Sequence, residues 1–156
     1  MPSNSGVGRI FQFGAGPTNV TIRHNTGLIT VAGGFTAVAD QAGNKGDQFD
    51  FRDNVLSAGR YGFKGSGTAE GTGTLDGHFT NYTFTNNAII GSTGTYPAGN
   101  FFPSNNAAVG FVNFAGGDYT LGAGSPFTGL GANFAGIAAA ATASSALPPP
   151  VNLRVQ

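Results

Sequence analysis

The sequence predicts an all-β protein in which short strands stack as successive coils of a solenoid. Three observations lead to this prediction: a strand-and-asparagine segment that recurs along the chain, a composition rich in Gly and poor in charge, and a closing segment, Val109–Gly131, after which the recurrence stops. Of the 156 residues 27 are Gly, and only 9% are charged. Such a composition suits extracellular β-proteins better than cytosolic helical enzymes.

The recurrent segment carries the same residue types at the same offsets in three places. The copies are VTIRHN ending at Asn25, FDFRDN ending at Asn54 and YTFTNN ending at Asn87, so that successive Asn residues are 29 and then 33 residues apart. A fourth, degenerate copy, VGFVNF, contains Asn113. Because repeats of this length mark stacked structural units, we expect these Asn residues to occupy equivalent corners of successive coils.

Each copy is predicted to form a strand followed by a bend. Apolar residues stand five and three positions before each Asn, with polar residues between them, which is the period of a strand with one buried face. The apolar pairs are Val20 and Ile22, Phe49 and Phe51, and Tyr82 and Phe84. Asn tolerates the left-handed backbone region, so we expect the bend at Asn and amide hydrogen bonds from coil to coil. An antiparallel sandwich is the alternative fold, but it requires no such identity of offsets.

The closing segment is expected to end the stack. Gly116 and Gly117 permit a turn, Tyr119 and Leu121 are predicted to plug the open core, and Pro126 cannot extend the ladder. The predicted divisions are 1–17 as an N-terminal edge or leading partial coil, 18–131 as the coils, 132–147 as an Ala-rich capping segment, and 148–156 as a Pro-rich linker and the start of a truncated β-sandwich domain.

These segments resemble a known superfamily. Coils of the form Phe/Val-x-Ile/Phe-x-x-Asn that end in GFVNFAGGDYTLGAGSPFTGLG are similar to the C-terminal part of exported bacterial proteins of the pectate-lyase-like superfamily. The resemblance covers about 18–131 and implies a right-handed parallel β-helix of a few coils with a C-terminal capping segment. It does not imply an activity, because this fold hosts lyases, hydrolases, adhesins and structural stalks.

Composition excludes several classes of function. Lys plus Arg equals Asp plus Glu, at seven each, so the chain has no basic footprint for nucleic acid. Cys is absent, which excludes disulfides and thiolate chemistry. The longest apolar stretch is too short to span a bilayer. No signal peptide is recognised in the first ten residues, and we expect an extracellular or cell-surface location by way of a signal outside this chain.

Stacking of the coils predicts one dense cluster of ionisable groups. Arg23, Arg52 and Asp50 would share the outer face and form a ligand site for polysaccharide, because Arg pairs with uronate carboxylates. Asp53 and His24 would lie beside them, and the candidate catalytic residues are Arg52, Asp53 and His24. Asp50 and Asp53 are also weak candidates for Ca²⁺ ligands, although no metal or other cofactor is required by the sequence. The alternative is that these groups form surface ion pairs of little energetic value.

Three functions remain open from the sequence. The leading hypothesis is a non-catalytic structural or carbohydrate-contacting module, and the second is part of a polysaccharide lyase or glycoside hydrolase. The third is a fibre subunit or homo-oligomer that assembles through its coil ends, since an uncapped first coil would leave a free sheet edge. The Gly-rich stretch Gly62–Gly77 is predicted to be a loop between coils, followed by His78 as a surface residue.

Overall fold

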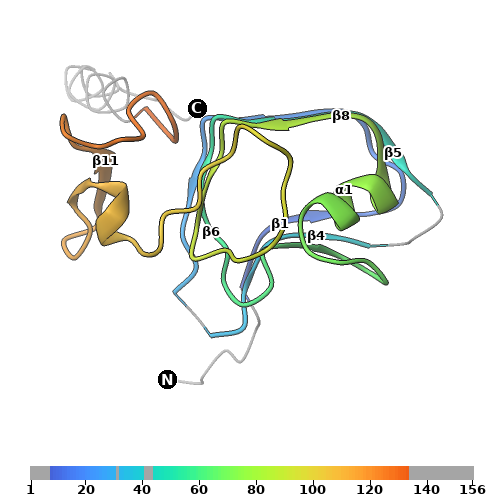
Figure 1. Cartoon of the computed structure of the whole chain (residues 1–156), viewed down its shortest axis with the longest axis horizontal. Coiled ribbons are helices and arrows are strands. Elements are labelled where there is room, and N and C mark those ends of the chain that lie inside the picture. Colours follow the sequence, from blue (N-terminus) through green and yellow to red (C-terminus); the bar gives the residue numbers. More distant parts are fainter. Residues whose placement is uncertain (1–7, 31, 41–43, 134–156) are drawn as a thin grey trace, which may run out of the picture.

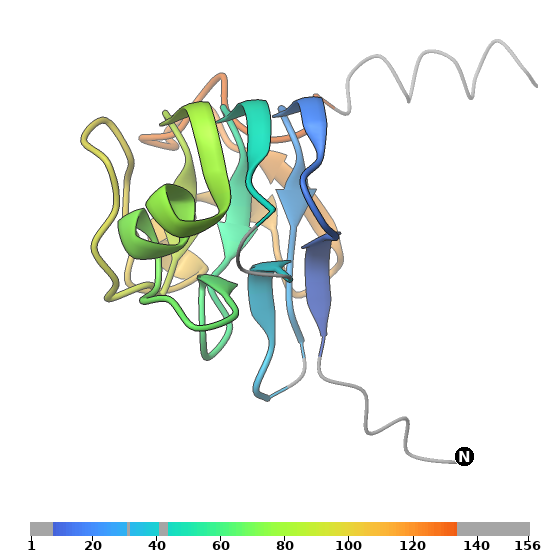
Figure 2. The same cartoon turned by 90° about the vertical axis from the view of Figure 1, so that its right-hand side faces the viewer.

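The computed structural model describes residues 8–30, 32–40 and 44–133. Over these residues the chain forms three parallel sheets of three strands, one antiparallel pair of strands and one short α-helix. Each turn of the chain contributes one strand to each parallel sheet, so that successive turns lie one behind another (Figure 1) and side by side in the perpendicular view (Figure 2). An all-β chain with parallel sheets is therefore confirmed, and the arrangement is compatible with a parallel β-solenoid.

Each parallel sheet has its middle strand in the second coil. The first sheet contains β1 (Arg9–Phe13), β4 (Phe35–Ala39) and β7 (Phe63–Gly65). The second contains β2 (Thr18–Arg23), β5 (Gly46–Arg52) and β8 (Phe79–Thr85). The third contains β3 (Thr26–Gly27), β6 (Val55–Ser57) and β9 (Ala88–Ile90). β1 lies within the predicted N-terminal segment 1–17 and pairs in parallel with β4, so this segment supplies a strand of the first coil.

In the second sheet, the residues that the three repeat copies have at the same offset pair with one another. Its inner files are Val20, Phe49 and Tyr82, and Ile22, Phe51 and Phe84. Phe51 and Phe84 stack with ring centroids 5.1 Å apart and an interplanar angle of 3°. Phe49 stacks on Phe79 at 4.2 Å, and Phe63 faces these rings from the first sheet. Stacked aromatic rings therefore fill the space inside the coils, which accounts for the abundance of Phe.

A ladder of asparagines joins the coils at the corner that follows the second sheet. The backbone N–H and the Nδ2 of Asn25 both donate to Asn54 Oδ1, at 2.9 and 3.0 Å. The backbone N–H and the Nδ2 of Asn54 donate in the same way to Asn87 Oδ1, at 3.2 and 2.9 Å. The Asn54 amide also donates to the carbonyls of Ile22 and Arg52. Asn54 and Asn87 are fully buried, so their polar atoms find partners within the stack rather than in water.

The fourth member of the ladder is Asn100. The N–H and Nδ2 of Asn87 donate to Asn100 Oδ1, each at 3.0 Å. The expectation of a fourth copy ending at Asn113 is therefore wrong: Asn113 is exposed and its Oδ1 accepts from Gly116 N within a hairpin. Asn100 lies only 13 residues after Asn87, because the fourth coil is short and closes over the end of the core. A local signal marks it, since Asn54, Asn87 and Asn100 are each followed by two apolar residues.

The bend lies one residue before each ladder asparagine rather than at the asparagine itself. His24, Asp53 and Asn86 have φ of 53°, 60° and 56°, and Gly99 has φ of 83°. These residues form a file of left-handed conformations, in which Asn, Asp and Gly are the favoured types. The repeated corner is thus a left-handed residue followed by a buried Asn.

A short helix, α1 (Thr72–His78), occupies the stretch that the sequence predicts to be a loop. Leu75 points into the core and is fully buried, and Thr74 Oγ1 donates to Ala69 O at 2.7 Å. His78 is buried rather than exposed, with Nε2 at 3.2 Å from Ser66 O. The helix could not be predicted from the sequence because Gly has a low helix propensity. It forms because burial of Leu75 in the core outweighs this low propensity.

The closing segment packs against the side of the stack, not over its end. A 3₁₀ helix (Ala107–Val109) is followed by β10 (Phe111–Asn113) and β11 (Asp118–Leu121), which pair antiparallel. This hairpin lies beside the third sheet (Figure 1). Outward-facing Val55, Ala88 and Ile90 of that sheet form a second apolar cluster with Val109 and Leu130.

Tyr119 and Leu121 therefore do not plug the core inside the coils. Leu121 packs on the second cluster, and the Tyr119 ring contacts the rings of Phe111 and Phe114. The coils end near residue 103 rather than at 131, and residues 104–131 form the lateral cover. The structure describes only residues 132 and 133 of the predicted capping segment 132–147, and none of the linker 148–156, so both predictions lie outside the described residues.

We expect Asn54→Ala to lower the free energy of unfolding by about 3 kcal/mol. The substitution leaves several buried polar groups without a hydrogen-bond partner, and each such group costs about 1–3 kcal/mol. Urea titration followed by circular dichroism measures this loss. Asn113→Ala is the matched control and is expected to lower the free energy by less than about 1 kcal/mol. Equal losses in the two variants would contradict a ladder that bears on stability.

Candidate functional site

The predicted ionisable cluster lies on the outer face of the second sheet. Arg23 and Arg52 are register partners in β2 and β5, and Asp50 stands two residues before Arg52 on the same face. Arg23 Nη2 and Arg52 Nη2 both donate to Asp50 Oδ2. Arg52 Nε also lies 2.9 Å from Asp50 Oδ1. This last contact is an ion pair without hydrogen-bond geometry, since neither buried atom has a hydrogen-bond partner.

The two guanidinium groups determine the state of the Asp50 carboxyl. Burial raises its pKa, but hydrogen bonds and charge from Arg23 and Arg52 outweigh burial and hold the pKa below its ordinary value of 3.8. A carboxyl that acts as a general acid needs a raised pKa. Asp50 is therefore suited to holding the two arginines and unsuited to donating a proton near neutral pH.

His24 and Asp53 meet at the corner of the coils, as members of the left-handed file. His24 Nε2 lies 3.8 Å from Asp53 Oδ2, and Asn86 Nδ2 donates to Asp53 Oδ1 at 2.6 Å. Arg52, Asp53 and His24, the candidate catalytic residues, thus each touch another side chain of this surface. The stacked register brings the five predicted site residues onto three neighbouring files, namely Arg23 with Arg52, His24 with Asp53, and Asp50 beside them.

The residues present do not fit a Ca²⁺ site. Both oxygens of Asp50 face guanidinium groups, and one oxygen of Asp53 is engaged by Asn86, whereas Ca²⁺ takes six to eight oxygen ligands, most of them carboxylate, carbonyl or water. Among the described residues, no group of three or more His, Asp or Glu side chains gathers where a metal ion could bind.

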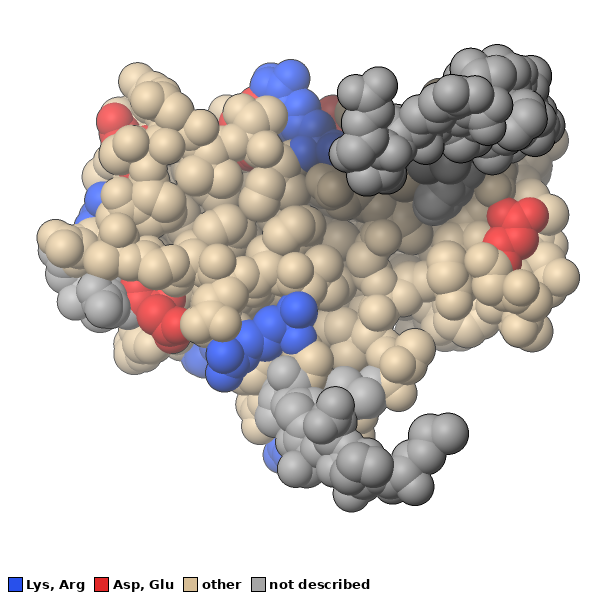
Figure 3. Space-filling model, turned by 180° about the vertical axis from the view of Figure 1, so that it is seen from behind, with Lys and Arg blue, Asp and Glu red and all other residues tan. Residues whose placement is uncertain are grey.

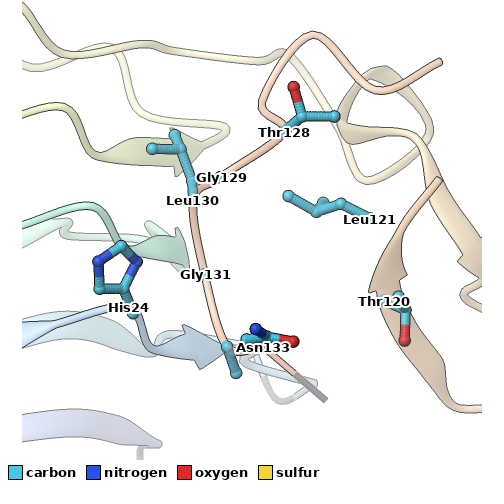
Figure 4. A pocket seen from close by; sticks show the side chains of 9 residues that line it. His24, Thr120, Leu121, Thr128, Gly129, Leu130, Gly131 and Asn133 are labelled. Carbon is cyan, nitrogen blue, oxygen red and sulfur yellow. The ribbon is translucent and has the colours of Figure 1, made fainter. Parts of the chain in front are cut away.

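A cavity of about 520 Å³ lies between the first coil and the closing segment. His24 is on one side, Thr120 and Leu121 of β11 are on the opposite side, and the stretch from Thr128 to Asn133 runs between them (Figure 4). Its lining includes no carboxylate and no guanidinium group. The cavity could not be foreseen from the sequence, because its walls depend on the lateral position of the hairpin.

A further surface combines aromatic rings with arginines. Phe35 and Tyr61 stack with ring centroids 4.5 Å apart, and Tyr61 is 37% exposed. The guanidinium carbon of Arg9 lies 6.0 Å from the Phe35 centroid, and that of Arg60 lies 5.3 Å from the Tyr61 centroid. Within the described part of the chain, neither arginine pairs with a carboxylate. We refer to these four residues as the arginine–aromatic column.

Charge is otherwise sparse on the molecule. Lys, Arg, Asp and Glu cover only small areas of the face in Figure 3, between wide uncharged regions. No helix in residues 8–30, 32–40 and 44–133 is long and apolar enough to cross a membrane.

Comparison with known proteins finds no match: no family model, no curated protein and no solved structure matches the chain.

The Asp50 pairing makes stability depend on acid pH. Because the pKa of Asp50 is lower in the folded protein than its ordinary value of 3.8, its contribution is complete above that value and is lost as the pH falls through the folded pKa. We expect the urea midpoint to fall less steeply in Asp50→Asn than in the natural chain between about pH 5 and about pH 2.5. Arg23→Gln, which removes one of the two partners, should give an intermediate slope. Identical slopes in all three proteins would show that the pairing does not affect folding.

Proposed function

We propose that this chain is a short right-handed parallel β-helix that serves as a rigid, non-catalytic structural module. One observation carries the proposal: the charged groups of the dense ionisable cluster pair with one another, and both arginines are held by the Asp50 carboxylate. A catalytic pair of carboxylates needs one group that protonates and another that activates water or attacks. Asp50 suits neither role while both its oxygens are engaged.

The handedness is supported by the path of the chain. In Figure 1 the chain runs counter-clockwise from β4 through β5 to β6, and Figure 2 has the later coils on the side nearer the viewer of Figure 1. A path that turns counter-clockwise as it approaches the viewer is right-handed. Rigidity is supported by the continuous stack of aromatic rings and by the buried amides of Asn54 and Asn87.

A second candidate function, contact with acidic carbohydrate, is favoured by the arginine–aromatic column. A guanidinium that lies over an aromatic ring keeps N–H edges available for a carboxylate. Arg60 has this arrangement, and so does Arg9 apart from its Nη1, which donates to Gln12 Oε1. Arg23 and Arg52 instead both donate to Asp50. The acidic-sugar contact is therefore assigned to the column and not to the predicted ligand site.

We expect no turnover of polygalacturonate or alginate, with or without added Ca²⁺, when unsaturated products and reducing ends are measured. Turnover that disappears in Arg52→Ala or Asp53→Asn would overturn the non-catalytic proposal.

Affinity electrophoresis through gels that contain polygalacturonate tests the second candidate. We expect Arg60→Ala to reduce retardation by about fivefold or more, since one charge-assisted contact contributes about 1–2 kcal/mol. Arg52→Ala, the matched control with the same loss of charge, should be retarded as much as the natural chain when each mobility is compared with that in a gel without polygalacturonate. Equal effects of the two variants would indicate non-specific charge attraction.

A further inference from the structure

We propose that this chain stacks end to end on a second copy of itself, with the asparagine ladder continued across the contact; this inference rests on the β-helix proposed above. The two ends in question are the first coil, with strands β1 to β3, and the short fourth coil, which carries Asn100. They lie on opposite sides of the stack, and the hairpin of β10 and β11 lies alongside (Figures 1 and 2).

The ladder has a direction, and its two ends are therefore chemically different. At every step the N–H of one Asn donates to the Oδ1 of the Asn in the next coil. At the start of the ladder, Asn25 Oδ1 receives no hydrogen bond from the described residues. At its end, the Asn100 N–H finds no acceptor among them. The unfilled acceptor at one end is the complement of the unfilled donor at the other.

A second series of hydrogen bonds runs through the same corner. Val55 N donates to Asn25 O, Ala88 N to Asn54 O and Phe101 N to Asn87 O, each at 2.8 Å. The next acceptor in this series is Asn100 O. Thr26 has the position of Val55 in the first coil, so the N–H of Thr26 in a second copy is the matching donor. Head-to-tail stacking thus extends both series without a change of register.

Apolar side chains accompany these polar groups at both ends. Phe101 and Phe102 of the fourth coil are 42% and 43% exposed. Ile10, Phe11 and Ile22 of the first coil are only partly buried. Stacking would cover part of this apolar surface, chiefly beside the ladder corner, and would contribute to association in proportion to the apolar area covered.

The geometry also limits the strength of the contact. The fourth coil spans only 13 residues between Asn87 and Asn100, against 33 between Asn54 and Asn87, and it carries no counterparts of β1 and β2 in the described structure. The ladder corner and the strand beside it therefore supply most of the contact. Because a head-to-tail contact of this kind does not close on itself, the assembly grows as an open chain with concentration.

Head-to-head contact between two first coils is chemically less suitable. It would bring two unfilled Asn25 acceptors together without the donors that the ladder supplies, and it would leave Asn100 unpaired. The second copy is therefore expected to present its fourth coil to the first coil.

Sedimentation velocity of the full chain over a range of concentrations tests the assembly. We expect species larger than the monomer whose proportion rises with concentration. Asn25→Ala should lower the association constant about tenfold, as expected for a lost buried hydrogen bond. Asn113→Ala, which removes an exposed amide of the hairpin outside the ladder, is the matched control, and we expect its association constant to stay within about threefold of the natural value. Circular dichroism and urea titration check that both variants fold.

Cross-linking tests the direction of stacking, and the absence of Cys from the natural chain makes it selective. Thr21→Cys places a thiol on the outer face of the first coil, and Ala98→Cys places one beside the exposed fourth coil. A short bismaleimide should join the two variants only when they are mixed. Cross-linked dimers of Thr21→Cys alone would indicate head-to-head contact and overturn the proposal.

A chain that sediments as a monomer at every concentration also overturns the end-to-end contact. That result would leave the proposal of a non-catalytic β-helix module intact. Turnover of a polysaccharide by a chain that self-assembles would overturn the non-catalytic proposal and leave the end-to-end contact intact.

Discussion

The buried amide at each corner constrains every strand of this protein. Asn54 and Asn87 have no access to water, so each must find its partners in the coils before and after it, and only one register of the coils supplies them. A strand displaced by one residue would turn its Phe side chains outward and its charged residues into the core. The aromatic stack and the outer ion cluster are both consequences of that register.

The sequence revealed the repeated parts of the structure and missed the parts that occur once. Identical offsets around Asn25, Asn54 and Asn87 were sufficient to predict parallel alignment, because stacking requires equivalent residues to recur. The role of Asn100 in the ladder could not be predicted from a constant period, because its coil is less than half as long as the one before it. Helix α1 and the lateral hairpin depend on tertiary packing, of Leu75 in the core and of Leu121 and Leu130 on the third sheet, which no local pattern encodes.

The candidate site shows the same division. Stacking correctly brought Arg23, Asp50 and Arg52 onto one surface, but composition could not tell whether those charges would face a ligand or one another. The arginine–aromatic column was not foreseen, because its members come from strand β1, the start of β4 and the turn before β7, where the repeat has no shared motif. Attraction between neighbouring charges and rings, not their density along the chain, decides which groups remain available to a partner.

The hairpin's position beside the third sheet has a consequence for the order in which the chain folds. Ala132 N donates to Thr26 Oγ1 across 106 residues, and Gly131 N donates to Asp53 O. The surface that receives them does not exist until β3, β6 and β9 have assembled, and contacts between distant residues carry a large entropic cost of loop closure. We therefore expect the coils to form first, with one apolar flank exposed, and residues 104–133 to pack on that flank only afterwards.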